Sequence, residues 1–141
     1  MVSIRRATSQ DASILNASLR LLSKHLGDAH RASDDELRGA LERGLVHAFL
    51  AEEDGVVGVV LFSAVFSTTR GSPGVYVSDL WVTEDHRHEG LGSELLEAAR
   101  SYSREAWNAS YLSLVVYDEN EDACAFYRAL GFKVHGRFLV R

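Results

Sequence analysis

The stretch HRHEGLGSELLEAA, residues 86–99, sets two glycines two positions apart where an apolar helical pattern begins. Each glycine inside a helix costs roughly 1 kcal/mol relative to alanine. Gly90 and Gly92 therefore need a reason to stand there, just after Arg87. The apolar repeat that follows has helical spacing and predicts a long helix over about 90–107, so the glycines mark its first turn.

A phosphate-binding turn would explain both glycines. The first turn of a helix leaves backbone N–H groups without partners, and the helix dipole makes that end positive, so phosphates bind there. Gly90 and Gly92 leave the approach to the backbone open, and Arg87 adds a charge-assisted donor. The spacing alone is weak, because a P-loop needs a lysine and a dinucleotide loop needs a third glycine where Leu95 stands. An ordinary loop-to-helix junction is the alternative.

The composition is that of a soluble globular protein. The chain has 141 residues, 46% hydrophobic and 25% charged, which suits one domain with a proper core. Its net charge of −5 argues against a nucleic-acid binder. The longest apolar stretch, 56–66, is too short to span a bilayer, and no signal-peptide pattern opens the chain. The single cysteine, Cys124, excludes an internal disulfide and is typical of a reducing compartment. We expect one cytoplasmic domain, 1–141, without nucleic-acid or membrane partners.

Turn and capping signals divide the first half of the chain. Capping boxes at Thr8–Asp11 and Ser33–Glu36 each predict the start of a helix. The dipeptide Asp54-Gly55 predicts a tight hairpin. Strands are expected over 2–7, 46–52, 56–66 and 75–82, the last after a turn at 71–74. The helices are expected to end at Gly27 and Gly44, the first with an apolar face of Ile14, Leu15, Leu19, Leu22 and Leu26.

The second half changes to a strand–helix–strand pattern. The helix at 90–107 is followed by a strand over 111–117, and Asn120 caps a helix that stops at Gly131. One strand, or two short ones, close the chain over 132–140. A crossover helix implies that 75–82 and 111–117 are parallel. The expected fold class is α/β: a mixed, mostly antiparallel sheet of six to seven strands with helices on both faces.

Two motifs at this separation resemble the GNAT superfamily of N-acetyltransferases. Arg87-x-x-Gly90-x-Gly92 matches the family's coenzyme-A pyrophosphate motif. The stretch 120–132, Asn-x-x-Ala-x-x-Phe-Tyr followed by Leu-Gly-Phe, matches its second coenzyme-binding segment. The resemblance covers most of the chain in the family's order of elements and is sharpest over 75–132. It is nearest to diamine and spermidine acetyltransferases, and it implies that the parallel pair splays apart around acetyl-CoA.

The resemblance also implies which residues bind the acetyl-CoA cosubstrate. The pantetheine arm would pair with the open edge of strand 75–82, and the Val82 N–H would face the thioester carbonyl. The amides from His88 to Ser93 would hold the pyrophosphate. The implied cofactor-binding residues are Trp81, Val82, Thr83, Arg87, His88, Glu89, Gly90, Leu91, Gly92, Ser93, Asn120, Phe126 and Tyr127.

Two residues are candidates for acid–base work. Tyr127 matches the tyrosine that protonates the leaving thiolate in similar enzymes; a core aromatic is the alternative. A lysine-like amine is free base in only about one molecule in 2,500 at pH 7, so a proton acceptor is needed. Asp79, expected just before a bulge in its strand, is the leading candidate, or else a side chain that anchors the splayed strand. Ser78 stands where diamine acetyltransferases commonly carry a glutamate, and Glu84 and Glu52 are lesser candidates.

The resemblance implies transfer of acetyl from acetyl-CoA to a primary amine by direct attack in a ternary complex. A polyamine, diamine or aminoalkyl amino acid is the leading acceptor, with an aminoglycoside or a protein amine as alternatives. A coenzyme-A-binding sensory module without turnover is the competing class of function. The six histidines show no metal-ligand spacing, so no metal is expected, and Cys124 is expected to pack in the core. Exposed sheet edges make a homodimer possible.

Overall fold

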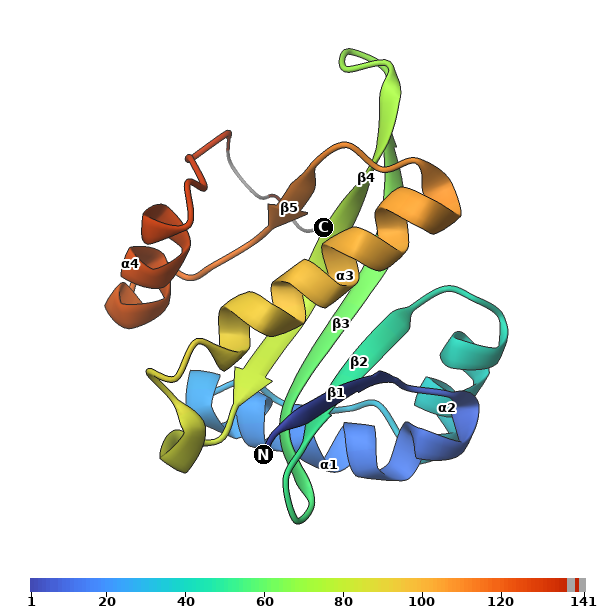
Figure 1. Ribbon diagram of the computed structural model, residues 1–141, viewed down its shortest axis with the longest axis vertical. Coiled ribbons are helices and arrows are strands. Elements are labelled where there is room, and N and C mark those ends of the chain that lie inside the picture. The colour runs from blue at the N-terminus through green and yellow to red at the C-terminus, as the bar shows by residue number, and fades with distance from the viewer. Residues whose placement is uncertain (137–138, 140–141) are drawn as a thin grey trace.

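A five-stranded mixed sheet runs through the part of the chain that the computed structural model describes, residues 1–136 and 139 (Figure 1). Its strands lie in the order β1-β2-β3-β4-β5. Neighbouring strands from β1 to β4 are antiparallel, whereas β4 and β5 are parallel. The predicted mixed, mostly antiparallel sheet is confirmed. The strands are β1 (Ser3–Arg6), β2 (His47–Glu52), β3 (Val56–Ser67), β4 (Ser72–Val82) and β5 (Leu112–Leu114).

The predicted number of strands, six to seven, is wrong for the described residues. The closing strand expected over 132–140 lies partly outside them, and 132–136 form no strand. Val134 there is 98% exposed, so its apolar pattern meets no neighbouring strand. The strand predicted to reach 117 ends at Leu114, where its pairing with β4 stops. Strand β4 begins at Ser72 rather than 75, because the turn lies at 68–71 and ends in Gly71 with φ 67°.

Four α-helices lie around the sheet in the described residues, and both predicted capping boxes are formed. The Thr8–Asp11 box is formed, but it caps the short 3-10 helix η1 (Ser9–Asp11), which leads directly into α1. The Ser33–Glu36 box caps α2 as predicted. A second 3-10 helix, η2 (Glu84–His86), follows β4. The α-helices are α1 (Ala12–Leu26), α2 (Asp34–Glu42), α3 (Leu91–Trp107) and α4 (Glu121–Ala129).

The sheet separates two hydrophobic cores, which confirms helices on both faces. On one face α3 packs through Leu91, Leu95 and Leu96. On the other face α1 and α2 pack through Leu15, Leu19 and Leu37. The predicted face of α1 was wrong at Ile14, which is 44% exposed because the helix turns that position toward solvent. No helix among the described residues is long and apolar enough to cross a membrane.

Strands β4 and β5 diverge soon after they meet, as predicted. They pair only where Val75–Val77 lie beside Leu112–Leu114. Beyond this point β4 runs on to Val82, while the chain after β5 leaves the sheet for α4 (Figure 1). The last five residues of β4 therefore have a neighbouring strand, β3, on one side only.

Candidate active site

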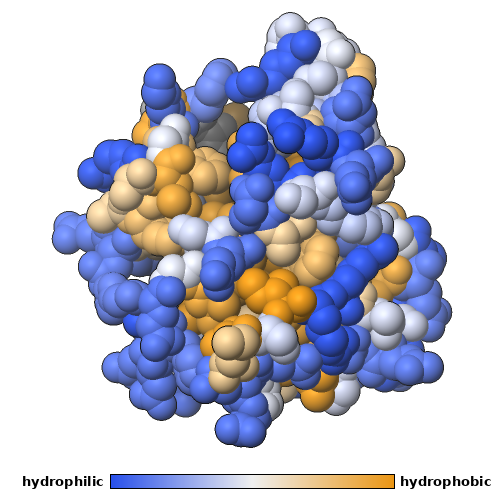
Figure 2. Space-filling view, viewed as in Figure 1, coloured by the Kyte–Doolittle hydropathy of each residue, from blue (hydrophilic) through white to orange (hydrophobic). Residues whose placement is uncertain are grey.

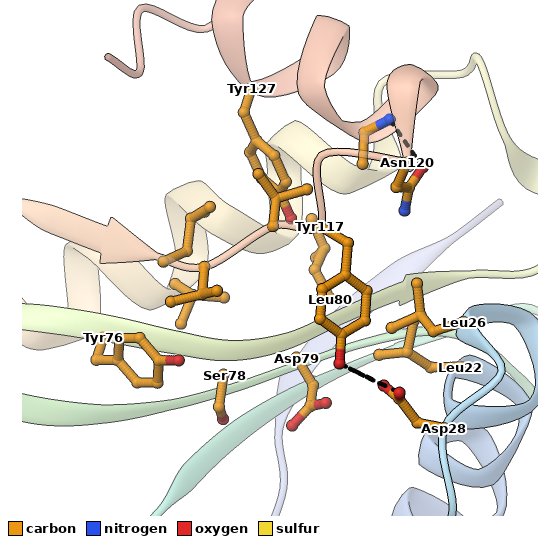
Figure 3. Close-up of a pocket in the computed structure, with 15 residues that line it drawn as sticks. Leu22, Leu26, Asp28, Tyr76, Ser78, Asp79, Leu80, Tyr117, Asn120 and Tyr127 are labelled. Carbon is orange, nitrogen blue, oxygen red and sulfur yellow. Dashed lines mark hydrogen bonds between the residues drawn. The ribbon is translucent and has the colours of Figure 1, made fainter. Parts of the chain in front are cut away.

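A cavity of about 240 Å³ opens where β4 and β5 part. It lies between the end of α1, the second half of β4 and the segment from β5 to α4 (Figure 3). Part of its wall is apolar and comes from Leu22, Leu26 and Leu80. The polar residues that line it are Asp28, Tyr76, Ser78, Asp79, Tyr117, Asn120 and Tyr127. Carboxylates, phenols and one amide thus meet beside an unpaired strand edge.

A β-bulge decides the direction of Asp79. Register places Val77 opposite Phe62 but Asp79 opposite Leu61, so Ser78 is the extra residue. Val77 and Leu80 both pack in the core under α3, which regular alternation would not allow. The bulge instead puts Ser78 and Asp79 on the same side of β4 (Figure 3), and both side chains line the cavity. Sequence reasoning placed the bulge after Asp79; it lies directly before it, because the shift comes at Ser78.

Burial raises the pKa of the Asp79 carboxyl. Hydrogen bonding with Ser78 and the nearby charge of His30 oppose this shift without cancelling it. His30 itself is held at 2.9 Å from Ser23 Oγ and at 2.8 Å from Oδ1 of the buried Asn16. A carboxylate that is partly withdrawn from water binds a proton more readily than an exposed one. Asp79 therefore has the environment of a proton acceptor.

Tyr127 is both a packed aromatic side chain and a part of the cavity wall. Its ring packs between Phe126 and Phe132, with centroid distances of 5.1 and 5.5 Å. It also extends from α4 toward the sheet and lines the cavity (Figure 3). Burial first, and then the negative charge of Asp79, raise its pKa to about 12. The phenol is thus protonated near neutral pH, and its acidity depends on the charge of Asp79.

The open edge of β4 offers the backbone of Val82. Thr83 N–H donates to Val57 O of β3 at 2.9 Å, so Thr83 turns its amide toward β3. Because backbone groups alternate between the two edges of a strand, Val82 turns its N–H and C=O to the open side. Its carbonyl there accepts from Arg87 Nε at 3.0 Å. Of the three predicted edge residues Trp81, Val82 and Thr83, only Val82 turns its amide to the open edge of β4.

The side chain of Trp81 lies on the α1 face, away from α3. It packs against the core formed with α1 and α2, and its ring is 5.6 Å from that of His25. The guanidinium of Arg87 lies over the same ring at 4.8 Å. Arg87, which lies in the loop after β4, therefore contacts two neighbouring residues of that strand, Trp81 and Val82.

The two glycines of the loop have different structural reasons. Gly90 is the residue before α3 and has φ 83°, a left-handed conformation that favours glycine. It gives no side-chain cap, so the first N–H groups of the helix stay available to a ligand. Gly92 lies under Phe126, and a Cβ on it would come within 3.1 Å of that ring. The second glycine thus allows α4 to pack against the start of α3.

The remaining predicted cofactor residues divide between backbone and side-chain positions. His88, with φ 65°, and Glu89 are exposed in the loop before α3. Leu91 is buried in the core, so only its amide faces the helix end, and Ser93 is half-buried. Asn120 caps α4 by accepting from Ala123 N–H at 3.2 Å and also lines the cavity. Of the predicted side chains on α4, Phe126 lies against Gly92 at the start of α3.

Sequence reasoning missed three of the polar residues that line the cavity: Asp28, Tyr76 and Tyr117. Asp28 and Tyr117 come from loops 89 positions apart, so no spacing in the sequence could link them. The lesser base candidates lie elsewhere, since Glu52 is paired with Arg5 at 2.6 Å and Glu84 is exposed in η2. Within the described residues, no group of three histidine, cysteine, aspartate or glutamate side chains is placed to hold a metal ion.

The model of the acetyltransferase (GNAT) family matches residues 15–132. The chain belongs to this family. A GNAT protein was expected from the two motifs around α3 and α4, and that expectation is confirmed. The splayed β4–β5 pair, the cavity where these strands part and the uncapped start of α3 are thus features of an N-acetyltransferase.

Two relatives of this GNAT protein are named for acetyl transfer to thialysine or to peptidyl-lysine. It is 30% identical to thialysine N-epsilon-acetyltransferase of Bos taurus over 143 residues, covering 92% of this chain and 83% of the relative. It is 31% identical to peptidyl-lysine N-acetyltransferase YjaB of Escherichia coli K12 over 146 residues, covering 97% and 86%.

Solved structures share the fold at lower identity. The ribosomal-protein-alanine N-acetyltransferase of Brucella melitensis biovar Abortus 2308 matches with a TM-score of 0.82 at 23% identity, covering 100% of this chain and 99% of that one. Aminoglycoside N-acetyltransferase AAC(6')-Iy in complex with CoA matches with a TM-score of 0.81 at 19% identity, covering 100% and 93%.

Proposed function

We propose that this N-acetyltransferase moves the acetyl group of acetyl-CoA to a primary amine of a small molecule, by direct attack in a ternary complex. One observation carries the proposal. Asp79 and Tyr127, a candidate proton acceptor and a candidate proton donor, line the same cavity beside the unpaired edge of β4. A non-catalytic coenzyme-binding module would need neither group in that position.

The cosubstrate has a suitable place along this edge. The pantetheine amides would pair with the backbone of Val82, as an added strand does. The Val82 N–H would then donate to the thioester carbonyl oxygen, where negative charge develops during attack. The pyrophosphate would rest on the uncapped amides that follow Gly90, at the positive end of the 17-residue helix α3. Arg87 would have to release Val82 O before a pantetheine group could use that carbonyl.

The reaction balances with the groups that line the cavity. The amine nitrogen attacks the thioester carbonyl carbon, a C–N bond forms and the C–S bond breaks. The proton lost by the amine goes to Asp79, directly or through water. The thiolate of coenzyme A accepts a hydrogen bond and then a proton from Tyr127. Return of the proton from Asp79 to the Tyr127 phenolate through water restores both groups, and free coenzyme A and an N-acetyl amide are the products.

The acidities of the two groups are coupled, and this coupling favours the sequence of proton transfers. Protonation of a thiolate with pKa near 8.5 by a phenol with pKa about 12 is uphill by roughly 5 kcal/mol. Part of that elevation comes from the negative charge of Asp79. When Asp79 takes the amine proton its charge disappears and the Tyr127 pKa falls. Proton uptake by the base therefore prepares the acid for the next step.

The acceptor class rests on the relatives and on the acidic cavity. Thialysine N-epsilon-acetyltransferase and peptidyl-lysine N-acetyltransferase YjaB are both named for lysine-like amines. We favour a diamine, polyamine or aminoalkyl amino acid, because a cavity of about 240 Å³ with two carboxylates suits a small cation. An aminoglycoside or a protein amine is the alternative. We also propose a cytoplasmic location, supported by the single free cysteine, and a homodimer, supported by the unpaired sheet edges.

The test is an amine panel assayed for thiol release from acetyl-CoA, together with Tyr127→Phe. Wild type is expected to release coenzyme A with small primary amines. Tyr127→Phe is expected to lower kcat by about 10²-fold while acetyl-CoA affinity, measured by calorimetry, changes little. Unchanged turnover would remove Tyr127 from the acid role. Tight binding of acetyl-CoA without turnover on any amine would favour the sensory module instead.

A further inference from the structure

A hydrogen bond crosses the chain at the cavity wall, between Tyr117 and Asp28. The Tyr117 hydroxyl donates to both carboxylate oxygens of Asp28, at 3.1 and 3.0 Å (Figure 3). Asp28 lies in the connection from α1 to α2, and Tyr117 lies in the connection from β5 to α4. Both residues line the cavity. The contact fixes the position of a carboxylate that belongs to an otherwise exposed loop.

The surroundings of Asp28 leave its charge without a cationic partner. It forms no ion pair with any residue in 1–136 or 139, and the residues that line the cavity include no lysine, arginine or histidine. Asp79, the proposed proton acceptor, comes from β4 and is a separate group of the same cavity. The apolar side chains of Leu22, Leu26 and Leu80 complete the wall. Two separate acidic groups and an apolar surface match a short hydrocarbon chain with a cationic group at each end.

We propose that Asp28 selects acceptors by binding their second cationic group, and that Tyr117 is the positioning residue that holds Asp28 toward the cavity. This inference rests on the proposed function, because it assigns the acceptor class of that same site. It favours free diamines and polyamines over a lysine side chain within a peptide. The peptidyl side chain carries one ammonium group, whereas a diamine keeps a second one after the first has lost its proton.

Matched substrates isolate the contribution of the second charge. The probes are 1,5-diaminopentane and 5-aminopentan-1-ol, which have the same length and differ in a distal ammonium against a hydroxyl. Wild type is expected to favour the diamine in kcat/KM by about tenfold or more. Asp28→Asn is expected to remove most of that preference by lowering kcat/KM for the diamine, mainly through KM, while the aminoalcohol value stays within about twofold. Asp118→Asn, one position after Tyr117 and outside the cavity wall, is the charge-matched control and is expected to keep the preference.

Tyr117→Phe separates positioning from structural support. It removes the hydroxyl but keeps the ring, so a positioning role predicts a partial loss of diamine preference with unchanged aminoalcohol turnover. If the hydrogen bond only held the two loops together, its loss would lower kcat/KM for both substrates equally and would also lower thermal stability. Equal losses on both substrates in Asp28→Asn, or an unaltered preference, would overturn the proposal.

A binding measurement keeps this inference distinct from the catalytic one. If the wild type turns over neither probe, the proposed function fails on these acceptors. Calorimetric titration of 1,5-diaminopentane into wild type and Asp28→Asn, each saturated with coenzyme A, then decides the inference on its own. About tenfold weaker diamine binding by the variant supports it, and equal or absent binding in both proteins refutes it.

Discussion

One extra residue in β4 changes both the direction and the acidity of the Asp79 side chain. The bulge at Ser78 turns the carboxylate to the cavity and partly removes it from water, which raises its pKa. A carboxyl with a raised pKa in the folded state binds more protons than it does in the unfolded chain. Its contribution to stability is therefore present at low pH and is lost as pH rises through the raised pKa. At neutral pH this side chain is useful for catalysis at a cost in folding free energy.

The first prediction concerns Asp79→Asn. This change should lower kcat/KM by about 10²-fold or more, because it removes the proton acceptor. It should also raise the melting temperature at pH 7, since a neutral amide is buried more cheaply than a carboxylate. At pH 3, below even the ordinary aspartate pKa, the stability gain should shrink, because the wild-type carboxyl is then protonated as well. Enzyme assays and thermal unfolding at both pH values measure these effects.

Glu84→Gln is the matched control for Asp79→Asn, since Glu84 is exposed and outside the cavity. It should leave both activity and stability nearly unchanged. If Asp79→Asn kept wild-type turnover, the side chain would only anchor the splayed strand, and water or another group would accept the proton.

The start of α3 carries the next prediction, at the scale of one element. Gly90 has φ 83°, and an added Cβ would meet no atom within 4 Å, so alanine there strains the backbone without a clash. The strain should cost about 1 kcal/mol of stability. Gly90→Ala should also weaken acetyl-CoA binding, because relaxing the loop moves the amides proposed to hold the pyrophosphate. Denaturant unfolding and calorimetry measure the two effects.

Gly44→Ala is a strain-matched control for Gly90→Ala. Gly44 has φ 71° and likewise meets no atom within 4 Å, but it follows α2 and lies outside the proposed cofactor loop. Both variants should lose similar stability, and only Gly90→Ala should lose cofactor affinity. Equal affinities for acetyl-CoA in the two variants would contradict the proposed pyrophosphate site.

The capping box before α1 makes a pH-dependent prediction for another element. Asp11 accepts from both terminal nitrogens of Arg5 at 2.9 Å and from Thr8 N–H at 2.8 Å, and its pKa is lowered to about 2, chiefly by Arg5. A lowered folded pKa means stability that is present above about pH 4 and lost as pH falls toward 2. Asp11→Asn should cost about 1 kcal/mol at pH 7, after allowance for screening by water, and much less near pH 2. Chemical denaturation across this range is the measurement, with the exposed Glu105→Gln as control; a pH-independent loss would assign the effect to packing.

Across the whole molecule, the sequence predicted those features that depend on residues close together in the chain. Both capping boxes, the Asp54-Gly55 hairpin and the glycine loop depend on neighbouring residues, and the sequence displays them directly. The bulge at Ser78 depends on register with β3, and the Asp28–Tyr117 contact joins distant loops, so neither has a sequence pattern. The predicted strand over 132–140 failed within the described residues because alternation alone does not supply a partner strand. The glycine loop and the motif residues of the site could therefore be predicted from the sequence. The residues of the acceptor pocket that come from distant loops could not.

Residues 1–107 are packed more extensively than the described residues that follow them. Residues 1–107 contain both cores, whereas β5 pairs over three residues and α4 has no fully buried side chain. Hydrophobic side chains accordingly remain visible at the surface over α4 (Figure 2). The proposed cofactor would contact β4, the start of α3 and α4 together, and so would join the second part to the first.

The last prediction follows from this difference. Acetyl-CoA at about one hundred times its Kd should add about 2.7 kcal/mol to the free energy of unfolding. Hydrogen exchange should slow most at amides of 112–130 and of the loop before α3, because these have the lowest stability to local opening in the free protein. Amides of β2 and β3 within the cores should change far less, since they open mainly on global unfolding. Gly90→Ala at the same cofactor concentration should reduce the added protection in both segments together, because one ligand connects them. A uniform increase in protection over the chain, or protection confined to α3, would show that the cofactor does not bridge β4 and α4.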